Sequence, residues 1–126
     1  MALPTPDQFT STMREHALEH VSPEQLKELM PHLLSAFETL APFQPMSVRP
    51  VPPPWRSTAL AFEASWPDAY SLTVATRLPP FQGSPTQITL SRAGQMVYAL
   101  GSTYDHLAAS VELCMSHRPV VLVPRN

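Results

Sequence analysis

The sequence of 126 residues has little of what disulfide-linked, phosphate-binding or membrane proteins depend on. It contains one cysteine, so no disulfide can form within the chain. Its three glycines are too few for the glycine-rich loops that hold phosphate on backbone amides. No apolar run approaches the ~20 residues of a membrane-spanning helix, and the first residues lack the basic and apolar parts of a secretion signal. We therefore expect a soluble, cytoplasmic protein without a bound cofactor.

Charge is also scarce, since only 14% of the residues are charged and the net charge is −2. Lysine occurs once, at Lys27, among eight basic residues. This balance gives no basic field for a phosphate backbone, so nucleic acid is not an expected partner. A surface with few charges is typical of a protein whose faces are covered. We therefore expect a protein partner or a second copy in a homodimer.

Proline is abundant, and it divides the chain. Six of the sixteen prolines fall between residues 42 and 54. Proline fixes φ and lacks a backbone donor, so this stretch is predicted to be neither helix interior nor central strand. Apolar residues recur every three to four positions before residue 42 and every two positions after residue 56. The sequence thus predicts one α+β domain over 1–126, made of a helical arm (6–41), a Pro-rich strap (42–54), and a sheet with a C-terminal helix (55–126).

Two capping boxes mark the starts of the helices in the arm. Thr5 and Ser22 each precede a proline, and a glutamine follows three residues after each of them. These signals predict helices over 6–20 and 23–41. The second helix has one apolar stripe, which stays in phase across Pro31, so we expect a single bent helix rather than two. The stripe comprises Leu26, Leu29, Met30, Leu33, Leu34, Phe37 and Leu40.

Alternating apolar residues in the second half predict a four-stranded antiparallel meander. A helix over 103–117 and a short edge strand at 120–123 are expected to follow it. The residues predicted to face inward are Thr58, Leu60, Phe62, Ala64, Tyr70, Leu72, Val74, Thr76, Leu78, Ile88, Leu90, Met96, Tyr98 and Leu100.

The opposite face of this sheet is small, weakly polar and nearly uncharged, whereas a solvated sheet usually carries more charge. We interpret it as a docking surface, although an ordinary exposed face rich in serine and threonine is the competing interpretation. The predicted function is a non-enzymatic protein-protein interaction module, such as an adaptor, a small chaperone or an inhibitor. The predicted interface residues are Ser71, Thr73, Arg77, Gln87, Thr89, Val97, Val121 and Val123.

A small ligand-binding or metal-binding protein, or an enzyme, is the alternative. It would use a pocket between the helical arm and the sheet, with His16, His20 and either Tyr98 or Tyr104 as polar groups. His16 and His20 are spaced to share a metal, but zinc needs three or four ligands and the metalloprotease pattern is absent. We therefore predict no metal site.

Two further arrangements resemble parts of catalytic sites. Cys114 and His117 are three residues apart on the last predicted helix, and Ser110 lies between His106 and His117. Cys114 belongs to the apolar stripe of that helix, where burial suppresses thiolate reactivity. Ser110 has no nearby acid to orient a histidine. We interpret both as structural, so no catalytic residue is predicted.

Arginine and tryptophan suggest one more site. Arg56, Arg77 and Arg92 stand at predicted strand ends, and with Trp55 or Trp66 beside them they could form a small anion site. Pro50 and Pro53 give a PxxP spacing in the strap, but no arginine has the flanking offset of an SH3 ligand. The strap is therefore interpreted as a rigid connector that Trp55 anchors to the body.

Overall fold

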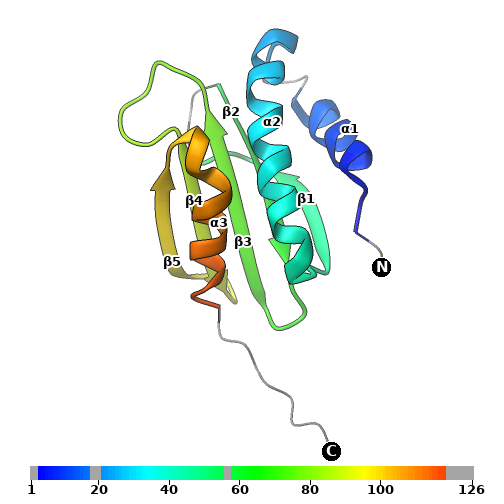
Figure 1. Cartoon of the computed structure of the whole chain (residues 1–126), viewed down its shortest axis with the longest axis vertical. Coiled ribbons are helices and arrows are strands. Elements are labelled where there is room, and N and C mark those ends of the chain that lie inside the picture. Colours follow the sequence, from blue (N-terminus) through cyan, green and yellow to red (C-terminus); the bar gives the residue numbers. More distant parts are fainter. Residues whose placement is uncertain (1–2, 18–20, 56–57, 119–126) are drawn as a thin grey trace, which may run out of the picture.

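The computed structural model of the chain describes residues 3–17, 21–55 and 58–118, and within them it is an α+β fold. Three α-helices accompany one five-stranded antiparallel sheet in these residues, with the strands side by side in chain order (Figure 1). The elements are α1 (Pro6–Ala17), α2 (Pro23–Leu40), β1 (Ser47–Val51), β2 (Ala59–Ser65), β3 (Tyr70–Arg77), β4 (Thr86–Arg92), β5 (Gln95–Ser102) and α3 (Leu107–Met115). Short 3-10 turns at Ala41–Phe43 and Tyr104–His106 follow α2 and precede α3.

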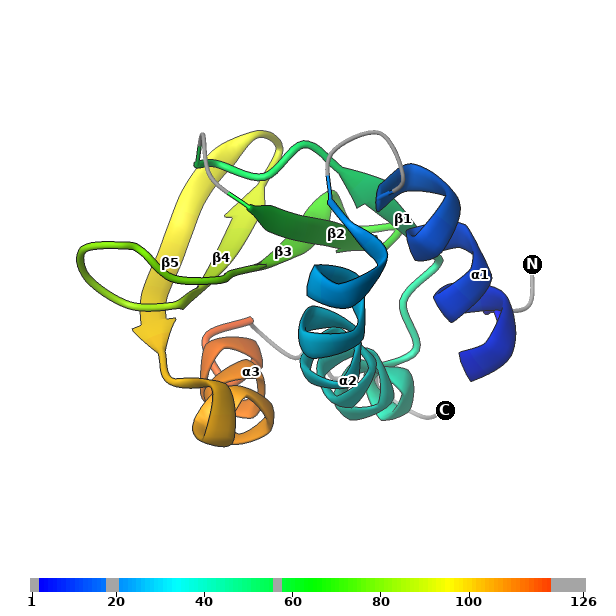
Figure 2. The ribbon, with the colours of Figure 1, turned by 90° about the horizontal axis from the view of Figure 1, so that it is seen from above.

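The helices all lie on one side of the sheet. Figure 2 shows α2 and α3 side by side beneath it, with α1 flanking α2 at the β1 end. Phe9 of α1 stacks on Phe37 of α2 with ring centroids 4.4 Å apart, and meets Phe62 of β2 edge-on at 5.1 Å. These three rings join both predicted helices of the arm to the sheet, so the arm packs on its own body. No helix within the described ranges is both long and apolar enough to cross a bilayer.

Both predicted capping boxes are formed. The Thr5 and Ser22 hydroxyls each accept from the backbone N–H of the glutamine three residues later, and each glutamine side chain accepts from the backbone of its capping residue. Helix α2 runs without a break through Pro31, as predicted, and ends at Leu40. Helix α1 is observed to Ala17, and its predicted end at 18–20 lies outside the described residues.

The Pro-rich strap is more than a connector, because it contains strand β1. Ser47–Val51 pairs antiparallel with β2, and Pro50 stands opposite Phe62. A proline is tolerated here because β1 is an edge strand. Only one side of β1 pairs with another strand in the described residues, so a missing N–H donor on the other side interrupts no hydrogen bonds of the sheet. The sheet therefore has five strands in the described residues, and β1 is the strand added to the predicted four-stranded meander. The predicted edge strand at 120–123 lies outside them.

The inward faces of β2, β3 and β4 are largely as predicted, but β5 departs from the alternation. Its register shifts at a bulge, where Leu90 pairs with Tyr98 and Ser91 pairs with Met96, so Val97 is the extra residue. Tyr98 and Leu100 face the core and are half-buried. The prediction of an inward Met96 is wrong, since Met96 is 69% exposed. The bulge moves it to the outer side of the sheet.

Candidate functional site on the outer sheet face

The outer face is the side of the sheet away from the helices, and its β2–β3 half is covered by the chain itself. Ala59, Ala61 and Ala75 point outward but are at most 2% exposed. After β1 the chain crosses this face, and Figure 2 shows it above the strands. Trp55 is on this crossing segment and lies over β3 and β4. The docking face predicted from alternation is thus only partly open.

Arg77, at the end of β3, contacts the segments that cover this part of the outer face. It is 9% exposed, and its ζ carbon lies 4.3 Å from the Trp55 ring centroid and 4.9 Å from that of Phe81. Its Nε and Nη2 donate to the Ser84 carbonyl at 3.3 and 3.1 Å, and Nη2 also donates to the Gln82 carbonyl. The guanidinium therefore fixes the β3–β4 loop and the Trp55 segment together.

Tyr104, one of the tyrosines considered for a ligand pocket, contacts the backbone of Arg77 at the end of β3. Its hydroxyl donates to the backbone carbonyl of Arg77, and its ring stacks on His32 with centroids 4.7 Å apart. Burial raises the pKa of Tyr104, and the Glu28 carboxylate raises it further, while Arg77 lowers it. The phenol therefore stays protonated, and a protonated hydroxyl is what this hydrogen bond requires.

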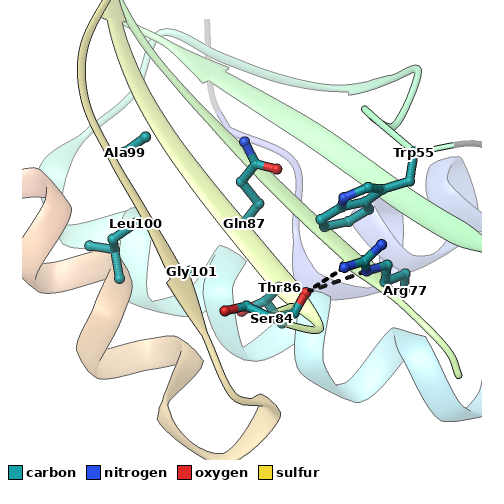
Figure 3. A pocket seen from close by; sticks show the side chains of 8 residues that line it. All are labelled: Trp55, Arg77, Ser84, Thr86, Gln87, Ala99, Leu100 and Gly101. Carbon is teal, nitrogen blue, oxygen red and sulfur yellow. Dashed lines mark hydrogen bonds between the residues drawn. The ribbon is translucent and has the colours of Figure 1, made fainter. Parts of the chain in front are cut away.

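A pocket of about 310 Å³ opens beside the guanidinium on the outer face. Figure 3 shows Trp55 and Arg77 on one side of it and Ala99 and Gly101 of β5 on the other, with the Gln87 side chain rising from β4 between them. Gly101 is required by the close approach of the β3–β4 loop, because a Cβ there would lie 2.3 Å from the Ser84 hydroxyl oxygen. The loop, β3, β4 and β5 together define the pocket.

The β4–β5 half of the outer face is the more open part. Thr89 and Ser91 are half-buried on β4, and Met96 and Val97 on β5 are 69% and 47% exposed. Strand β5 is also the last strand of the sheet, so one of its sides has no neighbouring strand in the described residues. None of its eight residues, Gln95–Ser102, carries a charge.

The predicted interface residues fall into three groups. Ser71 and Thr73 on β3 and Gln87 and Thr89 on β4 lie on the outer face and are half-buried, whereas Val97 is exposed at the bulge. Arg77 shares this face but is buried under Trp55 and Phe81. Val121 and Val123 lie outside the described residues.

The two tyrosines suggested for a pocket between the helical arm and the sheet have other partners in the described residues, since Tyr104 contacts His32 and the Arg77 carbonyl. A cavity of about 290 Å³ does lie between α1 and β1, where Phe9, Met13, Val48 and Pro50 are among its lining residues. Tyr98 stacks on His117 at the β5 side of the fold. His20 lies outside the described residues, and the described residues contain no cluster of three or more potential metal ligands.

Cys114 and His117 do not form a reactive pair. Cys114 is fully buried, and burial raises the pKa of its thiol to about 11, although a hydrogen bond with the Leu90 backbone acts in the opposite direction. The His117 ring instead contacts the Leu113 carbonyl oxygen through Nδ1 at 3.0 Å, and its centroid lies 3.6 Å from that of Tyr98. A thiol with this pKa is a packing group rather than a nucleophile at neutral pH.

Ser110, His106 and Arg92 have other structural partners. The Ser110 hydroxyl donates to the Ser102 hydroxyl at 2.8 Å, and His106 Nδ1 lies 2.9 Å from the Thr103 hydroxyl. Arg92 lies over the Tyr70 ring on the helical side of the sheet, opposite to Arg77, so these two arginines do not converge. Arg56 lies outside the described residues. Only the Arg77–Trp55 part of the suggested anion site is present in the described part of the chain.

Sequence reasoning missed Ser84, Ala99 and Gly101 as pocket residues. A glycine near the end of a strand was an available signal, because such a position often marks a close approach of another segment. No protein-family model matches this chain. The comparisons with curated proteins and with solved structures give no match either. Its function must therefore be argued from the geometry of this face.

Proposed function

We propose that the protein is a non-enzymatic protein-protein interaction module that accepts an extended strand at β5. The observation that carries the proposal is the composition of this edge. An eight-residue edge strand without proline or charge, with Met96 and Val97 exposed, presents a row of backbone donors and acceptors to any incoming strand. The open β4–β5 half of the outer face would lie beside that strand.

The opposite edge supports this interpretation by contrast. Strand β1 has five residues, and Pro50 within it cannot donate a hydrogen bond. Arg49 places a charge on the same strand, where its Nη2 lies 3.1 Å from a carboxylate oxygen of Glu63. Short length, proline, charge and bulges are among the features that protect edge strands from pairing. Of the two edges in the described residues, β1 has a short length, a proline and a charge, whereas β5 has only the bulge at Val97.

The incoming strand can come from a second copy or from another protein. Two β5 strands placed antiparallel would bring no like charges together, because the strand carries none. Such a homodimer would have one continuous sheet across both copies. A strand from another protein would occupy the same edge in an adaptor, a small chaperone or an inhibitor.

Light scattering across a range of concentrations tests the proposal. We expect the wild type to approach twice the chain mass of 14.0 kDa, and Val97→Lys on β5 to stay at the mass of one chain. Val51→Lys is the matched control, because it places the same charge at the end of the opposite edge strand. Equal masses for the wild type and Val97→Lys, both dimeric, would exclude β5 as the self-pairing edge.

A monomeric wild type would direct the test to foreign partners. A photo-crosslinking residue at position 97 should then capture a defined protein that the same residue at position 51 does not. A monomer whose two edges cross-link equally would refute the proposed interaction surface.

A further inference from the structure

The guanidinium of Arg77 is buried without a carboxylate partner among the described residues. Arg49 and Arg118 each pair with a carboxylate, of Glu63 and Asp68 respectively. Arg77 is 9% exposed, yet its hydrogen-bond acceptors are neutral carbonyls, reached through Nε and Nη2. Nη1 has no acceptor in the described residues, and it is not one of their buried polar atoms without a partner, so it is open to the pocket. A largely buried cation without an ionic partner is costly, and a ligand that supplies an anion at Nη1 would offset that cost.

The pocket beside Arg77 presents two chemically different parts. The polar part is the guanidinium together with the Gln87 amide, which points from β4 toward the Trp55 ring (Figure 3). The apolar part is the Trp55 indole and the methyl group of Ala99. Among the described residues that line the pocket, Arg77 is the only charged one, and its charge is positive.

We propose that this pocket binds a small molecule that carries one carboxylate on an apolar body. The carboxylate would accept from Arg77 Nη1 and from the Gln87 amide, and the apolar body would lie against Trp55 and Ala99. The single cation of the described lining matches one negative charge, whereas a phosphate group usually finds several cations or a nest of backbone amides. A volume of about 310 Å³ is near the lower end for ligand pockets, which limits the ligand to a small one.

A purely structural role for Arg77 explains only part of this arrangement. Holding the β3–β4 loop uses Nε and Nη2, which donate to the Ser84 and Gln82 carbonyls. It leaves Nη1 without an acceptor in the described residues. A structural role also does not explain why a pocket opens beside Arg77, at a place where a carboxylate side chain of the protein could have paired with the guanidinium. The proposed ligand supplies that carboxylate.

The test is an NMR titration of the intact chain with phenylacetate, read at the indole N–H signals of its two tryptophans. Trp55 lines the pocket, whereas Trp66 donates its indole N–H to the Phe43 carbonyl at 2.8 Å and is an internal reference. We expect a saturable shift of the Trp55 signal and no shift of the Trp66 signal. Phenylacetamide, the neutral analogue, should leave both signals unchanged, and phenyl phosphate should bind more weakly than phenylacetate.

Two variants and two controls complete the design. Ala99→Phe fills the pocket at an exposed position without touching Arg77, so it should fold normally and weaken phenylacetate binding about tenfold or more. Arg77→Gln should do the same if its melting curve shows a folded protein. Arg49→Gln removes an arginine outside the pocket, and Val97→Ser alters the β5 edge without adding a charge. Both should bind phenylacetate as the wild type does, which separates this site from the proposed pairing edge.

Three results would overturn the proposal. The first is a Trp55 signal that does not saturate with phenylacetate. The second is an equal response to phenylacetamide, which would show that the charge is not recognised. The third is unchanged affinity in Ala99→Phe, which would place the ligand elsewhere. Tighter binding of phenyl phosphate would replace the carboxylate by a phosphate as the recognised group.

Discussion

The ζ carbon of Arg77 lies 4.3 Å from the centroid of the Trp55 ring, so the end of β3 is joined to the segment that connects β1 to β2. This contact places a proline-rich segment over the outer face of the sheet. It explains why Ala59, Ala61 and Ala75 are buried although no helix covers them. The stretch with the most prolines therefore supplies both an edge strand and a partial cover for the sheet.

The Trp55 ring should contribute measurably to stability. Trp55→Ala removes the contact with the guanidinium and part of the cover over the alanines, so we expect the free energy of unfolding to fall by about 1–2 kcal/mol. Trp55→Phe keeps a ring at this position and should lose less than half as much. Urea denaturation followed by circular dichroism measures both. An unchanged midpoint in Trp55→Ala would mean that the ring does not stabilise this face.

Local signals were sufficient to predict the first two helices and most strand faces, whereas the helix predicted over 103–117 is a 3-10 turn at Tyr104–His106 followed by α3 from Leu107 to Met115. Thr5 and Ser22 begin their helices with complete capping boxes because these depend only on residues three positions apart. Leu72 and Val74 face the core as the alternation indicated. Strand β1 was missed because Pro50 argues against a strand unless the strand is known to be at an edge. That knowledge depends on the pairing of the whole sheet.

The site was harder to predict, for a related reason. Met96 was expected to face inward because the bulge at Val97, which reverses its direction, depends on pairing with β4. The pocket depends on the approach of Ser84 to Gly101, between segments that are not neighbours in the chain. Arg77 and Trp55 were both noticed as candidates. Their burial against one another is a tertiary contact that spacing along the chain does not encode.

Thr76 is predicted to be a position where a more stable protein can be made. It is fully buried in β3, and its hydroxyl has no hydrogen-bond partner among the described residues. An unsatisfied buried hydroxyl costs about 1–3 kcal/mol, and valine has nearly the same shape without the polar atom. Thr76→Val should therefore raise the free energy of unfolding by about 1 kcal/mol, measured by urea denaturation.

Thr86 is the matched control for this prediction. It is equally buried on the neighbouring strand β4, but its hydroxyl donates to the Ser102 carbonyl at 2.8 Å. Thr86→Val removes that donor and leaves the carbonyl without this bond, so it should lower stability by about 1–3 kcal/mol. Changes of the same sign in both variants would contradict the assignment of an unsatisfied hydroxyl to Thr76.

Gly101 should not tolerate even one added methyl group. The Cβ of Gly101→Ala would lie 2.3 Å from Ser84 Oγ and 2.7 Å from Ser84 Cβ. Relief requires Ser84 to move, and its carbonyl is an acceptor for Arg77. We expect a loss of about 1–3 kcal/mol, typical of an overpacked site. Melting temperatures and urea denaturation would measure it.

A second substitution tests whether this loss comes from the contact with Ser84. Ser84→Gly removes both clashing atoms, and the next nearest atom to the added Cβ is the Thr86 carbonyl oxygen, at 3.6 Å. In a double-mutant cycle, Gly101→Ala should therefore cost much less in the Ser84→Gly background than in the wild type. Equal costs in both backgrounds would assign the loss to the strand backbone.

Cys114 should make the stability of the protein sensitive to alkaline pH. Burial raises the pKa of this thiol from 9.0 to about 11, so the unfolded chain releases the proton at a lower pH than the folded chain does. Between these values the unfolded state binds fewer protons, and the free energy of unfolding must fall as the pH rises. Well below pH 9 the thiol is protonated in both states and contributes no slope.

The variant Cys114→Ala isolates this effect. It lowers stability at every pH because it leaves a small cavity, but the decline between pH 9 and pH 11 should be shallower than in the wild type. Tyr104, whose pKa is also raised, contributes the same slope to both proteins and cancels in the difference. Parallel stability curves would show that folding does not raise the pKa of the Cys114 thiol. Rapid reaction of the folded wild type with a thiol reagent at pH 8 would show that this thiol is accessible.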